Sequence, residues 1–350
     1  MVNFVKPRFT SSRIKAAGKR VKKGNENEED ITVIENFRGS HAYILNTFQA
    51  NIRNHSRSVA LSVGQRLKRR NTIIDKLARE PTMPLNAMQD IAGCRMVFSN
   101  LSDLNMVRDS MHSARWLHSL SHDLDHYNYI DKPKKTGYRG IHDVYKYNVN
   151  SHGGVPWNGL KIEIQYRTLP QHAWATAVEV ADLVTSSRIK FSDASSDYLR
   201  YFQMASEIIS RSAEISRSAE KRKSCCSDLS NHDLVNEFEI ADKRLGLLAT
   251  FDSLRQTSGR GIVFKKNTLL IFRFDVPENE EALIVRTFEN VNRAIEAYDD
   301  LEKKYGASAD IVLVRGESED NIRDAFRNYF SDARAFVDLM NDGIKILNSN

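Results

Sequence analysis

Four short blocks of charged residues in the first half of the chain have the composition of a phosphate-transfer site. Each block carries arginine or lysine, and two of them also carry a single acid. Enzymes that transfer phosphoryl groups use carboxylates to hold magnesium and cations to neutralise charge on the phosphate oxygens. The sequence therefore predicts a site for a magnesium-bound polyphosphate. The blocks are 66–68, 90–95, 132–142 and 163–168.

Asp90 and Glu163 are the candidate magnesium ligands. Glu163 lies within an apolar alternating stretch, where an unpaired acid would be costly to bury, so it needs a metal or an arginine as partner. A salt bridge with a purely structural role is the simpler interpretation of one such acid. Gln165 and Arg167 share its strand face, however, and this clustering favours a functional site.

The block at 132–142 combines lysines, a tyrosine and a histidine. Tyr138 follows a glycine and can either stack on a nucleobase or pack on the domain surface. Lysine clusters are usually solvated loops, and His142 can serve in the core, as a hydrogen-bond donor to phosphate or as an acid-base group. Their convergence within one short stretch favours ligand binding.

The elements that must position these residues alternate between strands and helices. Arg66 and Lys68 share one face of an expected strand, because side chains alternate along a strand. Thr72 is the expected N-cap of the next helix, which puts Lys76 in the first turn, where phosphate is favoured. The pattern predicts an α+β fold, with a mixed β-sheet flanked by helices. Strands are expected at 61–68, 94–98, 141–149 and 160–167, and helices at 31–57, 101–120 and 169–215.

At 350 residues, with 41% hydrophobic and 27% charged residues, the chain is long enough for two domains. The first 23 residues carry eight lysines or arginines, and acids follow, so 1–30 is an arm that is either a solvated tail or a grip on RNA phosphate. A solvated, partly frayed tail is the simpler interpretation. A first domain is expected at 31–215, a linker at 216–232 and a smaller C-terminal α/β domain at 233–350. Its expected elements are strands at 268–274 and 310–314 and helices at 280–305 and 320–347.

Composition excludes several classes of protein. No apolar run approaches the length of a membrane span and no signal-peptide pattern follows the N-terminal cations, so no membrane contact is expected and the cytoplasm is the expected location. Cys94, Cys225 and Cys226 lack metal-ligand spacing, which argues against a disulfide framework and against zinc. Any metal must therefore be a hard, oxygen-bound one. The net charge of +6 favours anionic partners.

Taken together, the four blocks resemble the synthetase domain of the RelA/SpoT alarmone synthetase family, which has a nucleotidyltransferase-like fold. The family patterns are R-x-K-x-x-x-S/T-x-x-x-K, D-I-A-G-x-R, P-K-x-x-G-Y-R-S-x-H and E-I-Q-x-R-T. The chain carries all four in this order, and the third contains one substitution. They begin at Arg66, Asp90, Pro133 and Glu163.

The resemblance implies a GTP/GDP diphosphokinase-type transferase with Mg²⁺ as cofactor. Such an enzyme moves the β,γ-pyrophosphoryl group of ATP to the ribose 3′-hydroxyl of GDP or GTP, which makes (p)ppGpp and releases AMP. By the same resemblance, Arg66 and Arg95 would sandwich adenine, and Lys68, Thr72 and Lys76 would hold the ATP phosphates.

The resemblance also assigns the metal and acceptor sites. Asp90 and Glu163 would coordinate magnesium as the catalytic carboxylates, and Glu163 would help to deprotonate the acceptor hydroxyl. Tyr138 would stack on the acceptor base. The other acceptor-binding residues would be Lys134, Arg139, His142, Gln165 and Arg167. Three positions depart from the family pattern: Gly140 and Thr72 stand where serine is usual, and Tyr166 where an aliphatic residue is usual.

No His-Asp hydrolase domain is recognisable upstream, so a stand-alone synthetase is expected, without activation by ribosomes. The C-terminal domain would regulate it or contact a protein partner or a second copy of the chain. One alternative is a toxic synthetase-like enzyme that pyrophosphorylates the 3′ end of tRNA, which the basic arm would suit. Another is a degenerate nucleotide sensor that binds ATP without releasing AMP. An adenine nucleotide as acceptor also stays open.

Overall fold

The structure is a computed structural model, and its strands form one mixed sheet. The strand order is β3-β4-β5-β2-β1-β8-β6-β7, and β2 pairs with β5 in parallel while the other pairs are antiparallel. The strands are β1 Ser62–Leu67, β2 Ala92–Phe98, β3 Ser119–Leu120, β4 Ile141–Lys146, β5 Lys161–Thr168, β6 Asn267–Arg273, β7 Leu283–Phe288 and β8 Ala309–Gly316. The structure describes residues 4–56, 59–185, 196–213, 224–253, 267–273, 283–305, 309–316 and 333–349.

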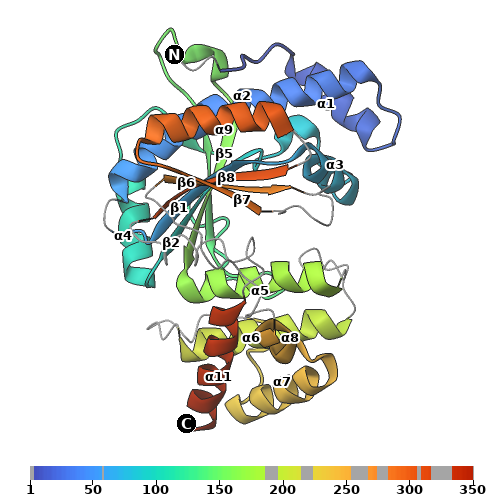
Figure 1. Cartoon of the computed structure of the whole chain (residues 1–350), viewed down its shortest axis with the longest axis vertical. Coiled ribbons are helices and arrows are strands. Elements are labelled where there is room, and N and C mark those ends of the chain that lie inside the picture. Colours follow the sequence, from blue (N-terminus) through green and yellow to red (C-terminus); the bar gives the residue numbers. More distant parts are fainter. Residues whose placement is uncertain are drawn as a thin grey trace.

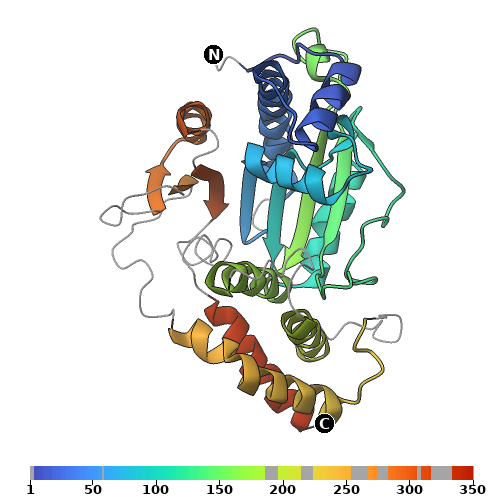
Figure 2. The same ribbon diagram turned by 90° about the vertical axis from the view of Figure 1, so that its right-hand side faces the viewer.

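Helices lie at both ends of this sheet. Figure 1 shows α2 and α9 at one end and α5, α6, α7, α8 and α11 gathered at the other, and Figure 2 shows the same separation from the side. The mixed sheet with its flanking helices confirms the expected α+β class. The helices are α1 Ser11–Val21, α2 Glu28–His55, α3 Arg70–Arg79, α4 Leu101–His112, α5 Leu169–Thr185, α6 Ser196–Ser212, α7 Asn231–Leu245, α8 Leu247–Ser253, α9 Val291–Tyr305 and α11 Arg334–Asn348, with 3-10 turns at Leu85–Ala87 and Val155–Trp157.

One face of the sheet is a core and the other is left for polar side chains. On β2 and β5 the buried positions include Cys94, Met96, Ile162 and Ile164, and α2 and α4 cover them with apolar residues. The alternate positions are only partly buried at Gly93 and Arg95 on β2 and at Glu163 and Gln165 on β5. The strict alternation of β5 was visible in the sequence, and it leaves the second face open for chemistry.

The C-terminal strands belong to the same sheet as the first half of the chain. β8 pairs with β1 from Ser62↔Gly316 to Gln65↔Leu313, and β6 joins β8 to β7. At the other end of the sheet, α11 places Phe336 and Met340 in a core with Trp174 and Phe202. The division at 216–232 remains a prediction, and 214–223 lie outside the described residues.

Three expected elements differ from those observed. The helix expected at 280–305 begins only at Val291, because LIVRTF at 283–288 is rich in branched residues and forms β7. The helix expected at 101–120 ends at His112, and 119–120 form a short strand. The helix expected at 320–347 is α11 from 334, while 320–332 lie outside the described residues.

The N-terminal arm is ordered where a frayed tail was expected. α1 buries Ile14 and Ala17, and Gly18 lets it approach the rest of the chain, because a Cβ there would lie 2.5 Å from the Cβ of Leu85. Arg20 donates two hydrogen bonds to the fully buried carboxylate of Asp30, which also caps α2. Apolar burial and this ion pair hold α1 against α2, so the frayed-tail interpretation is wrong for 11–21. None of the helices in the described ranges has the length and apolarity to cross a bilayer.

Candidate active site

The sheet register places the predicted site residues on one face. Arg66 on β1 lies opposite Gly93 on β2, which lies opposite Glu163 on β5. The next row contains Arg95 and Gln165, with His142 from β4 beside them. Directly opposed residues in a sheet point to the same side. The four sequence blocks therefore meet on the face that α2 and α4 leave uncovered.

Asp90 lies just before β2 and is held by two lysines. Nζ of Lys68 and Nζ of Lys76 each lie 3.0 Å from Oδ2 of Asp90. Burial opposes ionisation of this carboxyl group, but the two lysines outweigh it and lower the pKa of Asp90 below its ordinary value. Its other oxygen, Oδ1, is buried and has no hydrogen-bond partner among the described residues. Asp90 is thus an ionised carboxylate with one oxygen uncommitted among the described residues.

The position of Lys76 differs from the expectation. α3 begins at Arg70 with Arg69 in extended conformation as its N-cap, so Thr72 is the third residue of the helix and not its cap. Only two residues separate β1 from α3, so the helix begins earlier than a cap at Thr72 would require. Lys76 consequently lies in the last turn of α3 and reaches Asp90 from there. Among the described residues, the Thr72 side chain makes no hydrogen bond that would cap α3.

Glu163 begins a chain of hydrogen-bonded side chains across the face. Its Oε1 lies 3.0 Å from Nδ1 of His142, and its Oε2 accepts a 2.6 Å hydrogen bond from Gln165. Nε2 of His142 lies 2.6 Å from the hydroxyl of Tyr138, and Arg167 donates to that hydroxyl at 3.1 Å. Burial opposes ionisation of Glu163, but His142, Gln165 and Lys76 together hold its pKa well below the ordinary value. Glu163 is ionised at neutral pH.

The protonation states of Tyr138, His142 and Glu163 depend on one another. Burial opposes ionisation of Tyr138, but Arg167, His142 and Lys134 outweigh it and lower the pKa of the hydroxyl to about 7. Burial also disfavours the charged form of His142, yet Tyr138 and Glu163 raise its pKa above the ordinary value. The histidine between an acid and an acidic phenol is therefore poised to hold a proton on both ring nitrogens.

Gly140 explains one departure from the family pattern. Its φ of +146° lies in the region that side-chain-bearing residues rarely adopt, and a Cβ there would lie 3.0 Å from the hydroxyl of Tyr138 and 3.2 Å from the carbonyl oxygen of Tyr166. Serine at 140 would therefore crowd the Tyr138 hydroxyl. The glycine leaves room for that hydroxyl to reach His142.

Arginines cluster around an open floor. A Cβ built on Gly93 would approach other atoms only at 4.0 Å, so the sheet is bare between Arg66 and Glu163. Burial, together with Arg167 and Arg66, lowers the pKa of Arg95 to about 10, and Glu179 opposes this shift. Gathering like charges is costly unless an anion joins them, so the cluster suits a polyanionic ligand.

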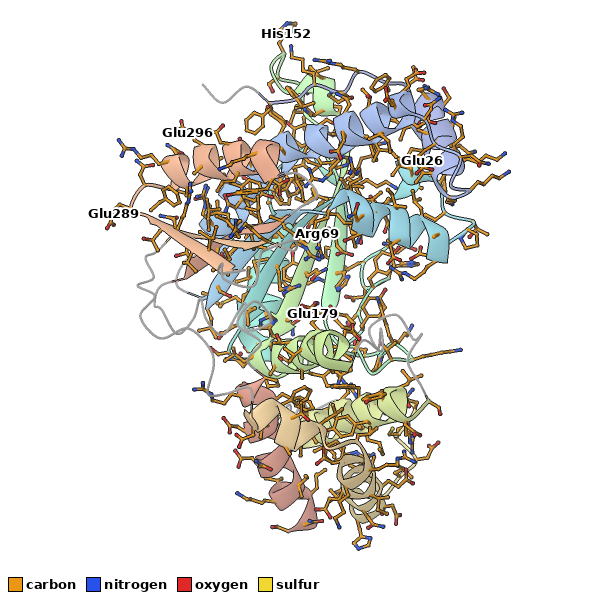
Figure 3. All side chains as sticks on the ribbon, turned by 45° about the vertical axis from the view of Figure 1, so that its right-hand side comes forward. Glu26, Arg69, His152, Glu179, Glu289 and Glu296 are labelled. Carbon is orange, nitrogen blue, oxygen red and sulfur yellow. The ribbon has the colours of Figure 1, made fainter. Side chains whose placement is uncertain are left out.

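Glu179 is a site neighbour that the sequence analysis did not select. It lies on α5, and Figure 3 shows it on the helix beneath the sheet, with Arg69 above it. It occurs in an apolar stretch with no charged partner in local sequence. An acidic residue in a helix of mostly apolar residues is rarely buried without a role, and this signal could have identified Glu179 as a site residue.

One predicted residue is not brought into the group. Arg139 is buried and donates to Ser206 and to the carboxylate of Glu207, at 3.1 Å and 2.8 Å, which fastens the loop before β4 to α6. Period-two alternation extended back from His142 places Arg139 on the opposite side, and this signal was available. A small pocket lies beside it, lined by Pro170, Gln171, Trp174, Ser206 and Ile209, and by neither carboxylate of the site. Lys134 remains at the rim, with Nζ 5.2 Å from the centre of the Tyr138 ring.

The donor set fits magnesium. Within the described ranges, no cluster of three or more histidine, cysteine or acidic side chains is arranged so that it could hold a metal ion. Mg²⁺ is commonly held by one or two carboxylates, with the remaining positions filled by substrate phosphate and water. Two carboxylates supply such a pair. Asp90 has an uncommitted Oδ1. Glu163 lies close enough for its charge to disfavour ionisation of Asp90. The pair remains a prediction as a metal site.

The comparison with known families covers the same part of the chain. Residues 65–183 match the model of the region found in RelA / SpoT proteins. This stretch is a RelA/SpoT region. All four sequence blocks fall within it, so the resemblance drawn from them is confirmed for these residues.

Two curated relatives of the RelA/SpoT region come from Bacillus subtilis (strain 168). GTP pyrophosphokinase YjbM is 32% identical over 114 residues, which are 32% of this chain and 51% of that protein. GTP pyrophosphokinase YwaC is 31% identical over 116 residues, 32% of this chain and 52% of that protein. The match thus spans about half the length of each relative.

Solved structures also align with this chain. The small alarmone synthetase 1 of Bacillus subtilis bound to its product pppGpp is 24% identical, with 53% of this chain and 93% of that chain covered and a TM-score of 0.42. The small alarmone synthetase 2 of Bacillus subtilis is 21% identical, with 52% and 92% covered and a TM-score of 0.40.

Proposed function

We propose that this protein is an ATP-dependent pyrophosphokinase that transfers the β,γ-pyrophosphoryl group of ATP to the ribose 3′-hydroxyl of GDP or GTP. One observation carries the proposal: Asp90 and Glu163 share Lys76 as a neighbouring cation. Lys76 contacts Asp90 directly, and its charge also lowers the pKa of Glu163. The RelA/SpoT match and the curated GTP pyrophosphokinases support the same reaction class.

The donor side of the face suits ATP. Arg66 and Arg95 lie in adjacent rows on β1 and β2, where planar guanidinium groups can flank an adenine ring over the bare floor at Gly93. Lys68 and Lys76 present charge beside Asp90. In the proposed complex these lysines neutralise phosphate oxygens while Asp90 and Glu163 hold Mg²⁺. The ion, when bound, offsets negative charge on the transferring group.

On the acceptor side, Glu163 is the group that binds the 3′-hydroxyl in the proposed complex. Glu163 is ionised, and its two oxygens are fixed by His142 and Gln165. A carboxylate with a lowered pKa is a weak base, but phosphoryl transfer passes through a loose transition state in most analyses, so it demands orientation of the hydroxyl before full removal of its proton. Glu163 therefore orients the 3′-hydroxyl and accepts its proton as the new P–O bond forms. Tyr138 and Arg167 border the acceptor position.

The test is an acceptor panel with labelled ATP. Purified protein is incubated with Mg²⁺ and γ-labelled ATP, in separate reactions with GDP, GTP, an adenine nucleotide and deacylated tRNA. The proposal predicts label on GDP or GTP with an equal amount of AMP. Label only on tRNA would replace this function with the tRNA reaction, and ATP binding without AMP release would indicate a sensor. Two of the eight cations of the arm, Arg13 and Arg20, pair with Glu29 and Asp30, which reduces the charge that the arm could offer to tRNA phosphate.

A further inference from the structure

Helix α9, near the C-terminus, touches the backbone of the proposed ATP site. The pairing between β8 and β1 ends at Gln65, before the residues that carry the donor cations. Two residues further along β1, the backbone N–H of Leu67 donates a 3.0 Å hydrogen bond to the hydroxyl of Tyr298, on α9. Leu67 lies between Arg66 and Lys68. β8 therefore holds β1 as far as Gln65, and Tyr298 of α9 holds it at Leu67.

A second contact holds the backbone at the next residue, Lys68. Arg38 of α2 donates from Nε to the carbonyl oxygen of Lys68 at 2.8 Å and from its NH2 group to Oε2 of Glu302, on α9, at 2.5 Å. The side chains of Arg38 and Glu302 are only 8% and 10% exposed. Burial disfavours the charged guanidinium, but Glu302 outweighs it and raises the pKa of Arg38. Glu302 therefore fixes the orientation of the guanidinium that binds the carbonyl oxygen of Lys68.

These contacts are placed where small shifts matter. Tyr298 and Glu302 lie four residues apart on α9, so they share one helix face, and together with Arg38 they bind the N–H of Leu67 and the C=O of Lys68. Arg66 and Lys68 are the residues on either side of Leu67, and the side chain of Lys68 reaches Asp90. A buried ion pair contributes little net stability compared with apolar packing, so its position is better explained by geometry than by stability.

We propose that Tyr298 and Glu302 are positioning residues for ATP. They fix the backbone at 67–68 so that Arg66 and Lys68 meet the nucleotide in the correct orientation. The C-terminal part of the chain is then a component of the donor site, and displacement of α9 weakens ATP binding without touching the acceptor. This inference rests on the proposed function, since it takes ATP as the donor. It assigns no catalytic step to either residue.

The test compares Tyr298→Phe and Glu302→Gln with Glu296→Gln. Glu296 is exposed on the same helix, and Figure 3 shows it pointing away from the sheet. Tyr298→Phe keeps the ring in its core and removes only the hydroxyl. The readouts are the KM for ATP and for the acceptor, kcat, the dissociation constant of a non-hydrolysable ATP analogue, and hydrogen exchange of the Leu67 amide.

For Tyr298→Phe and Glu302→Gln we expect the KM and the dissociation constant for the ATP analogue to rise about five- to tenfold, the effect of losing one hydrogen bond. The acceptor KM stays unchanged, the Leu67 amide exchanges faster in Tyr298→Phe, and Glu296→Gln behaves as wild type. A lower melting temperature with unchanged ATP affinity would overturn the inference and leave the proposed function standing. Failure of the wild-type protein to bind ATP would overturn both.

Discussion

Nζ of Lys76 lies 3.0 Å from Oδ2 of Asp90, although Lys76 belongs to helix α3 and Asp90 to the segment just before strand β2. The same lysine lowers the pKa of Glu163, and the charge of Glu163 in turn disfavours ionisation of Asp90. One cation therefore lies within electrostatic reach of both acids. Together with the contact between Lys68 and Asp90, this relationship ties the first, second and fourth sequence blocks into a single site.

Replacing Lys76 by methionine tests that relationship. The variant keeps the aliphatic length of the side chain but removes the charge, so the phosphate oxygens lose a partner in the transition state. We expect kcat/KM to fall about 100- to 1,000-fold, the range for removal of one preorganised donor. Lys15→Met on the exposed side of α1 is the matched control. Wild-type kinetics for Lys76→Met would remove this lysine from the mechanism.

Tyr138 has a ring and a hydroxyl that can be tested separately. Tyr138→Phe keeps the stacking surface, whereas Tyr138→Ala loses it, and base stacking contributes roughly 1–3 kcal/mol in single-strand binding. We expect Ala to raise the acceptor KM and Phe to leave it near the wild-type value at low pH. Steady-state kinetics with varied acceptor distinguishes the two. An ATP KM that changes while the acceptor KM does not would reassign the residue to the donor side.

The pH dependence of the acceptor KM follows from the same hydroxyl. The pKa of Tyr138 is lowered to about 7, so the Tyr138 and His142 pair loses a positive charge as the pH rises through that value. An anionic acceptor then binds less well, and its KM should increase from pH 6 to pH 8, a window of about one unit on each side of the pKa. Tyr138→Phe has no such proton to lose, so the increase in its acceptor KM over this range should be smaller. Identical profiles for both proteins would disprove the coupling.

Gly140→Ser restores the residue that the family commonly carries, and we expect it to be harmful here. The positive φ and the 3.0 Å approach to the Tyr138 hydroxyl should cost about 1–3 kcal/mol in the free energy of unfolding. Thermal unfolding measures the loss, and kinetics should show weaker acceptor use. Gly153→Ser is the control, since a Cβ there meets nothing within 4 Å. If both variants were equally stable, the glycine would have no conformational role.

The sequence was informative wherever a local period decides the structure. The alternation of β5 predicted that Glu163, Gln165 and Arg167 share a face, and they do. The capping rule failed at Thr72, because the chain enters α3 with an extended Arg69. Branched residues in 283–288 should have outweighed the helical spacing that follows them.

Contacts between distant segments could not be predicted in the same way. The register of β1, β2 and β5 aligns Arg66 with Gly93 and Glu163 through tertiary pairing, and no local pattern specifies it. The hydrogen bond from Leu67 to Tyr298 joins residues 231 positions apart. Nothing in the composition of α9 marks Tyr298 as different from a core tyrosine. Such contacts depend on which strands become neighbours.

Glu163→Gln tests the central claim most directly. The amide is nearly isosteric but carries no charge for magnesium or for the acceptor proton, so transfer of label from γ-labelled ATP to GDP or GTP should fall by about 100-fold or more. Glu239→Gln on the exposed face of α7 serves as control, and circular dichroism verifies folding. The account predicts labelled guanosine product and AMP from the wild-type protein and the control, and almost none from folded Glu163→Gln. Wild-type transfer by Glu163→Gln would contradict it.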